Sequence, residues 1–164
     1  GILYDWGVHL LEYTLQIVRS DIVEVSGYAK RGVWADKTRW KKDTNEDEGY
    51  AVVRYTSGAW STLMISSIDS KPKPGWIEVT GTKGSYSMEW GGWELITHDG
   101  NKTIITKGPN PESQGWKLYQ NIADHLTKGK ELIITAEWAR RPIHILDLAN
   151  NSAKLGKALP AKHK

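Results

Sequence analysis

Asp5 and His9 are the two side chains best suited to acid–base chemistry. They lie four residues apart in a segment with helical periodicity, so both should project from one helix face within reach of a common ligand. A carboxylate beside an imidazole stabilises the charged ring and orients it. Such a pair could move the proton of a hydroxyl group while a hydride leaves the same carbon. The alternative is structural, with Asp5 capping the helix and His9 packed near the core.

Glu12 continues the same face and completes the pattern Asp-x-x-x-His-x-x-Glu, which could bind a metal ion. No second cluster of ligands accompanies it, so we expect no metal site. The sequence contains no cysteine, which excludes disulfides, zinc–thiolate sites and cysteine nucleophiles.

Further candidates for substrate contact lie in a long loop predicted over residues 31–46. They are Trp34, Arg39 and Trp40. Aromatic faces stack on sugar rings and arginine binds oxygen atoms, so this loop could cover a substrate. It could equally contact another domain. Trp6, between the acid and the imidazole, completes the predicted substrate-binding set.

The chain has 164 residues, 39% hydrophobic and 25% charged, a balance that suits a globular domain with a real core. Periodicity predicts a helix over 4–19, then a block of strands, then two helices. The predicted strands cover 23–29, 49–55, 59–68, 76–80, 85–89, 93–97 and 103–106, and the later helices cover 112–127 and 135–155. This order predicts an α+β fold in which an open, mostly antiparallel sheet carries its helices on one face.

The two later helices carry recognisable signals. The first should bury the face formed by Leu118, Ile122 and Leu126. In the second, Thr135 should cap the start and Gly156 should end the helix. Pro142 lies inside it, so we expect a kink or a restart there.

The sheet face opposite the helices is predicted to be half apolar, with Trp60 and Met64 on one side of their strand. A broad face of this kind could be a subunit interface. The alternative is a solvated face that carries a few aromatic side chains.

Charge and motif content exclude several classes of protein. The formal net charge is only +3 and no basic stripe is interleaved with aromatic residues, so we expect no nucleic-acid partner. No apolar stretch approaches the ~20 residues that span a bilayer, and we expect a cytoplasmic protein. The sequence has no Gly-x-Gly-x-x-Gly fingerprint, no P-loop and no Gly-x-Ser-x-Gly elbow, so a dinucleotide would have to be held elsewhere.

Four segments in order resemble the Gfo/Idh/MocA oxidoreductases, the relatives of glucose–fructose oxidoreductase and inositol dehydrogenase. Residues 1–12 resemble the family's Asp-x-Gly-x-His-x-x-Asp/Glu helix, and residues 46–59 resemble its Glu-Asp strand and Gly-turned hairpin. Residues 77–85 are similar to its Gly-Thr-Lys-Gly turn. Residues 145–156 are similar to its terminal helix with a Ser-Ala-x-x-Gly end.

The resemblance implies a C-terminal α+β domain that follows an N-terminal Rossmann domain. It also implies hydride transfer between NAD or NADP and a sugar, polyol or related carbonyl compound. Asp5 matches the acidic position that orients substrate and catalytic groups, and His9 matches the usual acid/base. The family's Glu-Lys-Pro lysine belongs to the Rossmann domain and does not occur here. We therefore expect residues 1–164 to form a single substrate-binding and oligomerisation domain that is inactive alone and binds no cofactor by itself.

Two other functions remain open at this stage. Nine tryptophans could serve a carbohydrate-binding module, although such rings more often fill cores and interfaces. A purely oligomerising module without catalysis is the second alternative.

Overall fold

The structure is a computed structural model that describes residues 1–39, 44–73 and 75–162. It consists of two compact units, a first unit of Gly1–Ser70 with Ile134–Lys164 and a second unit of Lys71–Ile133. Both units contain an antiparallel sheet, and helices accompany the sheets. The predicted α+β class is therefore confirmed.

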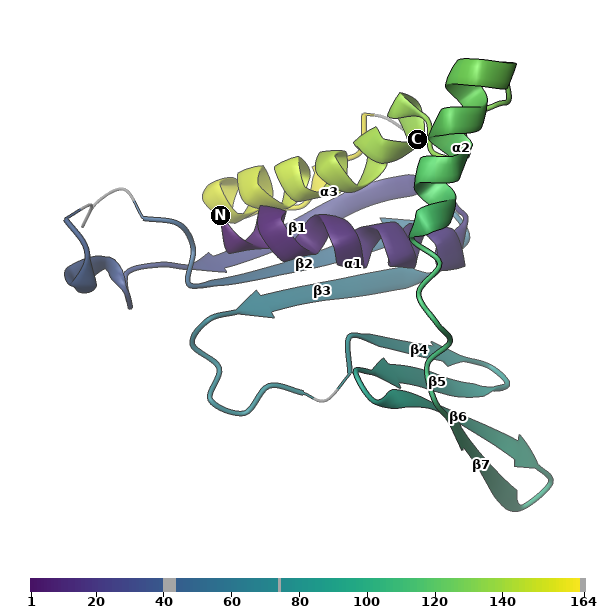
Figure 1. Ribbon diagram of the computed structural model, residues 1–164. Coiled ribbons are helices and arrows are strands. Elements are labelled where there is room, and N and C mark those ends of the chain that lie inside the picture. Colours follow the sequence, from purple (N-terminus) through teal and green to yellow (C-terminus); the bar gives the residue numbers. More distant parts are fainter. Residues whose placement is uncertain (40–43, 74, 163–164) are drawn as a thin grey trace. The chain divides into compact units, whose positions relative to one another are not determined.

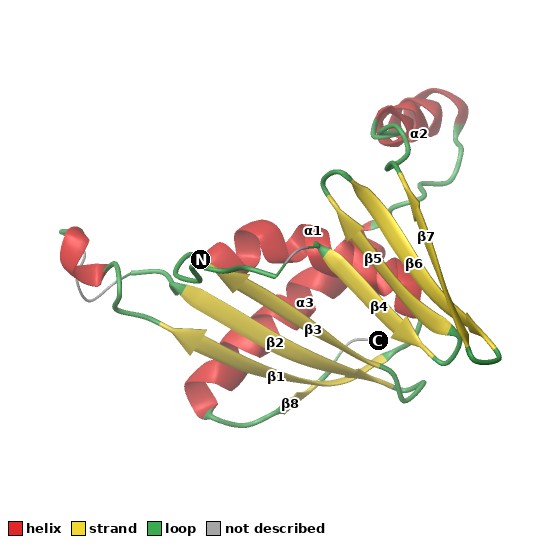
Figure 2. Ribbon diagram, turned by 90° about the horizontal axis from the view of Figure 1, so that it is seen from below, coloured by secondary structure: helices red, strands yellow, loops and turns green. Residues whose placement is uncertain are grey.

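In the first unit, two helices lie side by side on one face of a four-stranded antiparallel sheet (Figures 1 and 2). The sheet order is β3-β2-β1-β8. The elements are α1 (Ile2–Val18), β1 (Ile22–Lys30), the 3₁₀ helix η1 (Ala35–Lys37), β2 (Glu48–Tyr55), β3 (Trp60–Ser66), α3 (Ala136–Leu155) and β8 (Leu159–Pro160). Among its described residues, this unit has no helix on the opposite face of the sheet.

Helix α1 begins two residues earlier than expected and buries one of its faces. Leu3, Gly7, Leu11 and Leu15 recur every four residues and are buried, which is the spacing of one helix face. Arg19 ends the helix in the left-handed conformation, with φ 45° and ψ 45°, and its N–H donates to the Leu15 carbonyl at 3.2 Å.

The core of the first unit lies between the sheet and the two helices. Alternate side chains of the strands point into it, since side chains of a strand face opposite sides in turn. The buried strand residues include Ile22, Val25, Ala51, Val53, Tyr55 and Leu63, and the buried helix residues include Leu11, Leu15, Ile145, Leu146 and Ala149. Each large apolar side chain buried in this way contributes about 1.5–3 kcal/mol.

Helix α3 approaches strand β1 most closely at Gly27. A Cβ atom at this position would lie 1.9 Å from the carbonyl oxygen of Ala149, so no other residue fits without backbone movement. The buried Ser152 holds the contact: its Oγ accepts from the Gly27 N–H at 2.8 Å and donates to the Lys157 carbonyl at 2.6 Å. The serine of the terminal-helix motif therefore joins α3 to the sheet.

The signals for the ends of α3 are confirmed. The Thr135 hydroxyl accepts from the Trp138 N–H at 3.2 Å, and Gly156 ends the helix at φ 66°. The expected restart at Pro142 does not occur, because the helix runs unbroken from Ala136 to Leu155. Burial of Pro142 in the core offsets the hydrogen bond that its missing N–H cannot make. None of the helices within the described residues has both the length and the apolarity needed to cross a membrane.

The second unit contains a separate four-stranded antiparallel sheet and a helix. The sheet order is β4-β5-β6-β7, and the helix is α2 (Trp116–Lys128). The strands are β4 (Ile77–Gly81), β5 (Gly84–Glu89), β6 (Gly92–Asp99) and β7 (Lys102–Gly108). The single meander suggested by the run of strands is thus two sheets. Strand β3 pairs with β2, and Pro72 and Gly75 lie between β3 and β4, where proline removes a ladder donor.

Helix α2 differs from its prediction in the face it buries. Leu118, Ile122 and Leu126, expected on the core side, are 42%, 39% and 77% exposed. The buried residue of this helix is Asp124. Amphipathic spacing therefore predicted the helix correctly, but it could not tell whether the apolar side would be covered within the chain.

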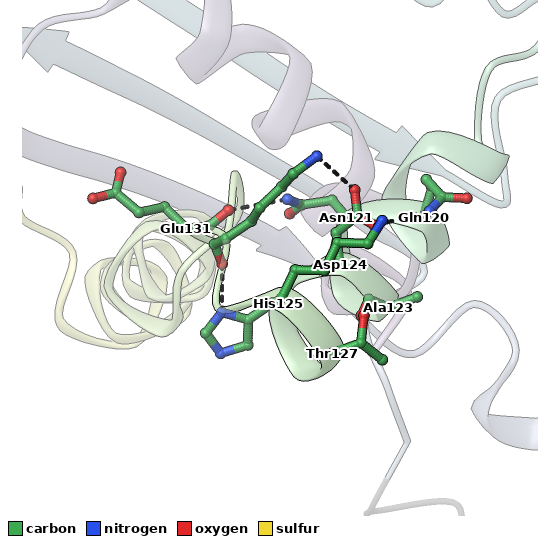
Figure 3. Close-up of polar contacts among 9 residues, drawn as sticks. Gln120, Asn121, Ala123, Asp124, His125, Thr127 and Glu131 are labelled. Atoms are coloured by element: carbon green, nitrogen blue, oxygen red, sulfur yellow. Dashed lines mark hydrogen bonds and ion pairs between the residues drawn. The ribbon is translucent and has the colours of Figure 1, made fainter.

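Polar contacts secure the C-terminal end of α2 (Figure 3). The Asp124 carboxylate binds Lys128 Nζ and Lys130 Nζ, each at 2.8 Å, and accepts from Gln120 Nε2 at 3.2 Å. Chiefly because of the Lys128 and Lys130 contacts, the pKa of Asp124 lies well below its usual range. Asn121 joins the same helix to the following loop, since its amide donates to the Glu131 carbonyl at 3.0 Å.

We predict that Gly27→Ala lowers the free energy of unfolding by about 3 kcal/mol, because the added methyl group meets the backbone of α3. Urea denaturation followed by circular dichroism measures the change. Gly91→Ala is the matched control, since a Cβ there meets nothing within 4 Å. Equal stability of the two variants would contradict the close approach.

Candidate functional site

The exposed face of α1 carries three of the residues that the sequence analysis predicted for the functional site. Asp5, Trp6 and His9 all lie on it, and Trp6 is 55% exposed. The rings of Trp6 and His9 lie 6.1 Å apart, centroid to centroid, at an interplanar angle of 60°. Their side chains share this face because residues three and four positions apart are neighbours on a helix.

Neither structural alternative for Asp5 and His9 describes what is seen. Gly1 occupies the N-cap position, and Asp5 lies within the first turn, where a carboxylate is favourable beside the helix dipole. His9 is exposed and is not packed in the core. Within the described part of the chain, no hydrogen bond or ion pair joins the Asp5 and His9 side chains. Both groups thus remain accessible to a ligand.

Glu12, the third member of the polar pattern, has a different role. Its Oε1 accepts from Trp138 Nε1 at 2.5 Å and from Gln16 Nε2 at 3.1 Å, so it joins α1 to α3. The described residues contain no group of three or more His, Cys, Asp or Glu side chains placed to hold a metal ion. Glu12 therefore contributes to helix packing, whereas Asp5 and His9 make no comparable contact with the residues that the structure describes.

The predicted loop leaves the end of the sheet at which α1 begins (Figure 1). Trp34 is 40% exposed, and Lys37 Nζ lies 4.0 Å from its ring centroid. Arg39 is exposed in the turn that follows η1. Trp40 lies outside the described residues. The structure places Trp34 and Arg39 on a segment separate from Asp5, Trp6 and His9, so these candidates come from two elements.

Two buried carboxylates, to which the sequence analysis gave no role, secure these elements. Glu46 is 8% exposed, and its Oε1 accepts from the Leu3 N–H of α1 at 2.9 Å. Asp47 is 3% exposed and accepts from the Val33 N–H at 2.9 Å in the loop. The available signal was the Glu-Asp pair that opens the family-like segment 46–59, directly before an apolar strand.

Tyr4 lies on the inner side of the same helix turn. Burial raises the pKa of its phenol, the nearby charges of Asp147 and Glu46 raise it further, and a hydrogen bond with Asn150 lowers it. Tyr4 therefore stays protonated at neutral pH.

A shallow hollow of about 260 Å³ lies on the second unit, and none of the predicted site residues lines it. It is lined by Ser87, Glu89, Gly91, Gly92, Trp93, Glu94, Lys107 and Gly108. Its charged groups are already paired in part, since Lys107 Nζ lies 2.7 Å from Glu94 Oε2. The α1 face thus remains the better candidate for chemistry.

The fold and the site define a class of protein. It is an α+β domain whose sheet carries helices on one face, and the exposed face of its first helix carries an aspartate and a histidine. The model of the GFO/IDH/MocA C-terminal domain family matches residues 1–87, and the chain belongs to this family. No curated protein matches the sequence significantly.

Several solved structures with the same fold are described as oxidoreductases. The chain is 19% identical to yvaA from Bacillus subtilis, assigned as an oxidoreductase, with a TM-score of 0.80, covering 98% of this chain and 50% of that one. An oxidoreductase from Agrobacterium radiobacter in complex with NAD+, L-tartaric acid and magnesium is 18% identical, with a TM-score of 0.70 and coverage of 97% and 48%. Aldose-aldose oxidoreductase from Caulobacter crescentus, complexed with glycerol, is 15% identical, with a TM-score of 0.67 and coverage of 94% and 45%. The chain spans about half the length of these proteins.

We predict that Glu12→Ala lowers the free energy of unfolding by about 1–3 kcal/mol, because it removes a charged acceptor and leaves the Trp138 indole N–H without its partner. Glu12→Gln, which keeps an acceptor oxygen, should lose less. Gln16→Ala on the same exposed face is the control and should change stability by less than about 0.5 kcal/mol. A Glu12→Ala variant as stable as this control in urea denaturation would contradict the link between the helices.

Proposed function

We propose that this chain is the substrate-side half of an NAD(P)-dependent oxidoreductase that acts on a sugar, a polyol or a related hydroxyl or carbonyl compound. One observation carries the proposal: Asp5 and His9 stand exposed on the same face of α1, in a chain of the GFO/IDH/MocA family. A proton-transfer group must reach its substrate, and this face is open.

His9 exchanges the hydroxyl proton of the substrate. In the oxidation direction the O–H bond breaks and its proton passes to His9, while the C–H bond breaks and its electron pair leaves with the hydride. The carbon–oxygen bond becomes a carbonyl, and reduction runs the same steps in reverse. Asp5, one turn away on the same exposed face, orients the substrate beside His9 during the transfer.

A nicotinamide cofactor, NAD or NADP, accepts or supplies the hydride in this reaction. The residues of this chain fit a substrate-binding role and not a cofactor-binding site, because no Gly-x-Gly-x-x-Gly fingerprint occurs in the sequence. We place the cofactor on a Rossmann domain elsewhere in the intact protein, and we expect these 164 residues to be inactive alone. A nicotinamide-dependent enzyme works beside the cellular cofactor pool, which favours the cytoplasm.

The substrate contacts are proposed to come from Trp6 on α1 and from Trp34, Arg39 and Trp40 of the loop. Aromatic faces and a guanidinium suit a small polyhydroxylated compound. The ligands in two structural neighbours, L-tartaric acid and glycerol, belong to that chemical class.

A second proposed role is assembly through the open face of the first unit's sheet. Trp60, Met64 and Tyr28 on this face are 71%, 46% and 62% exposed, and the rings of Tyr28 and Tyr50 lie 6.3 Å apart. Exposed aromatic and methionine side chains on adjacent strands favour a subunit interface of a dimer or tetramer.

We predict that His9→Ala in the full-length protein lowers kcat by about 10²–10⁴-fold while NAD(P)H binding is unchanged, because the proton acceptor is lost and the cofactor site is elsewhere. Asp5→Asn should lower kcat less. Steady-state kinetics and cofactor fluorescence measure the two effects. His98→Ala, an exposed histidine of the second unit, is the control, and turnover by His9→Ala equal to that of this control would refute the catalytic role.

We predict that Trp60→Glu combined with Tyr28→Lys converts an oligomer into monomers, because charge cannot be buried in an apolar interface. Size-exclusion chromatography with light scattering measures the mass. Trp116→Glu, on exposed helix α2, should leave the mass unchanged. A monomeric parent protein would refute the assembly role outright.

A further inference from the structure

Glu46 and Asp47 are adjacent carboxylates just before β2 (Glu48–Tyr55), and both are buried, with 8% and 3% exposure. Burying a carboxylate is costly unless hydrogen bonds or opposite charges compensate for the lost water. Proton exchange at Asp5 and His9 does not use either group. Their burial therefore calls for a different explanation.

Glu46 binds the first turn of α1. Its Oε1 accepts from the Leu3 N–H at 2.9 Å, a contact between residues 43 positions apart. Its Oε2 lies 3.6 Å from Arg31 Nη2. A Cβ on Gly1 would lie 2.1 Å from both carboxylate oxygens, so the carboxylate packs directly against this glycine. Glu46 thus joins the first turn of α1 to the segment that enters β2.

Asp47 holds the loop in a similar way. Its carboxylate accepts from the Val33 N–H at 2.9 Å and from the Trp34 N–H at 3.4 Å. Its backbone is tied to the sheet on both sides, because its N–H donates to the Lys30 carbonyl at 2.8 Å and its carbonyl accepts from the Ser67 N–H at 2.9 Å. The loop segment before η1 is therefore attached to a rigid point of the sheet.

We infer that Glu46 and Asp47 are positioning residues that set the placement of Asp5 and His9 relative to Trp34. Glu46 holds the first turn of α1, and Asp47 holds the segment that carries Trp34. Because the two carboxylates are neighbours in the segment that enters β2, a single peptide unit connects the attachments of both elements. The inference rests on the proposed function, since it assigns the two elements to one substrate site.

The two residues should affect different kinetic constants in the full-length protein. A displaced α1 misplaces the proton-transfer group, so Glu46→Ala should lower kcat ~10–100-fold with KM changed less than about threefold. Asp47→Asn replaces one acceptor oxygen with an amide NH₂ and frees part of the loop, so it should raise KM ~10-fold and leave kcat within about threefold. Glu46→Gln keeps an acceptor for Leu3 and should recover most of kcat. Glu94→Gln, which breaks an exposed ion pair of the second unit, is the control for charge alone.

Amide hydrogen exchange tests the contacts without reference to activity. In Glu46→Ala, exchange at residues 1–5 should accelerate about tenfold while residues 31–35 are unchanged, and Asp47→Ala should give the opposite pattern. Unchanged exchange in either variant overturns the inference, as do unchanged kinetic constants in an active enzyme. If the wild-type protein turns over no polyol or sugar with NAD or NADP, the proposed function fails and the positioning role falls with it. That outcome differs from an active wild type with indifferent variants, in which the inference alone fails.

Discussion

Helix α1 can cover the sheet with only one of its faces, and this constraint decides where its polar groups point. Leu3, Leu11 and Leu15 pack on the sheet, so the side chains on the opposite arc must face outward. Asp5 and His9 belong to that arc. Asp5 and His9 are thus exposed because the leucines on the other face of the helix are buried. Any displacement of the helix would move both groups together.

The position of α1 depends in turn on contacts made by residues distant in sequence. Its start is capped by Glu46, and its middle is joined to α3 through Glu12 and Trp138. Helix α3 itself can approach the sheet because Gly27 has no side chain. Charged hydrogen bonds at two points and a close backbone approach at a third hold a largely apolar layer in a defined register. This explains how a surface helix could hold reactive groups in constant positions.

The sequence predicted the helices and strands better than it predicted which other parts of the chain they pack or pair with. Thr135 and Gly156 mark the ends of α3 as expected, because capping depends on a few neighbouring residues. The exposed apolar side of α2 and the division into two sheets were not foreseen. Leu118 and Leu126 show amphipathic spacing whether or not another surface covers them. Likewise, consecutive strands alternate in the same way within one sheet or two, since pairing is a long-range property.

For the candidate site, the sequence by itself determined that Asp5, Trp6 and His9 share one helix face, because helical geometry relates residues three and four apart. It also determined the absence of a dinucleotide fingerprint. Only the tertiary structure decided that Glu12 serves packing and that Glu46 and Asp47 hold the helix and the loop. Hydrogen bonds between residues far apart in the chain are set by how the layers pack, and no local pattern encodes which buried carboxylate meets which unpaired N–H.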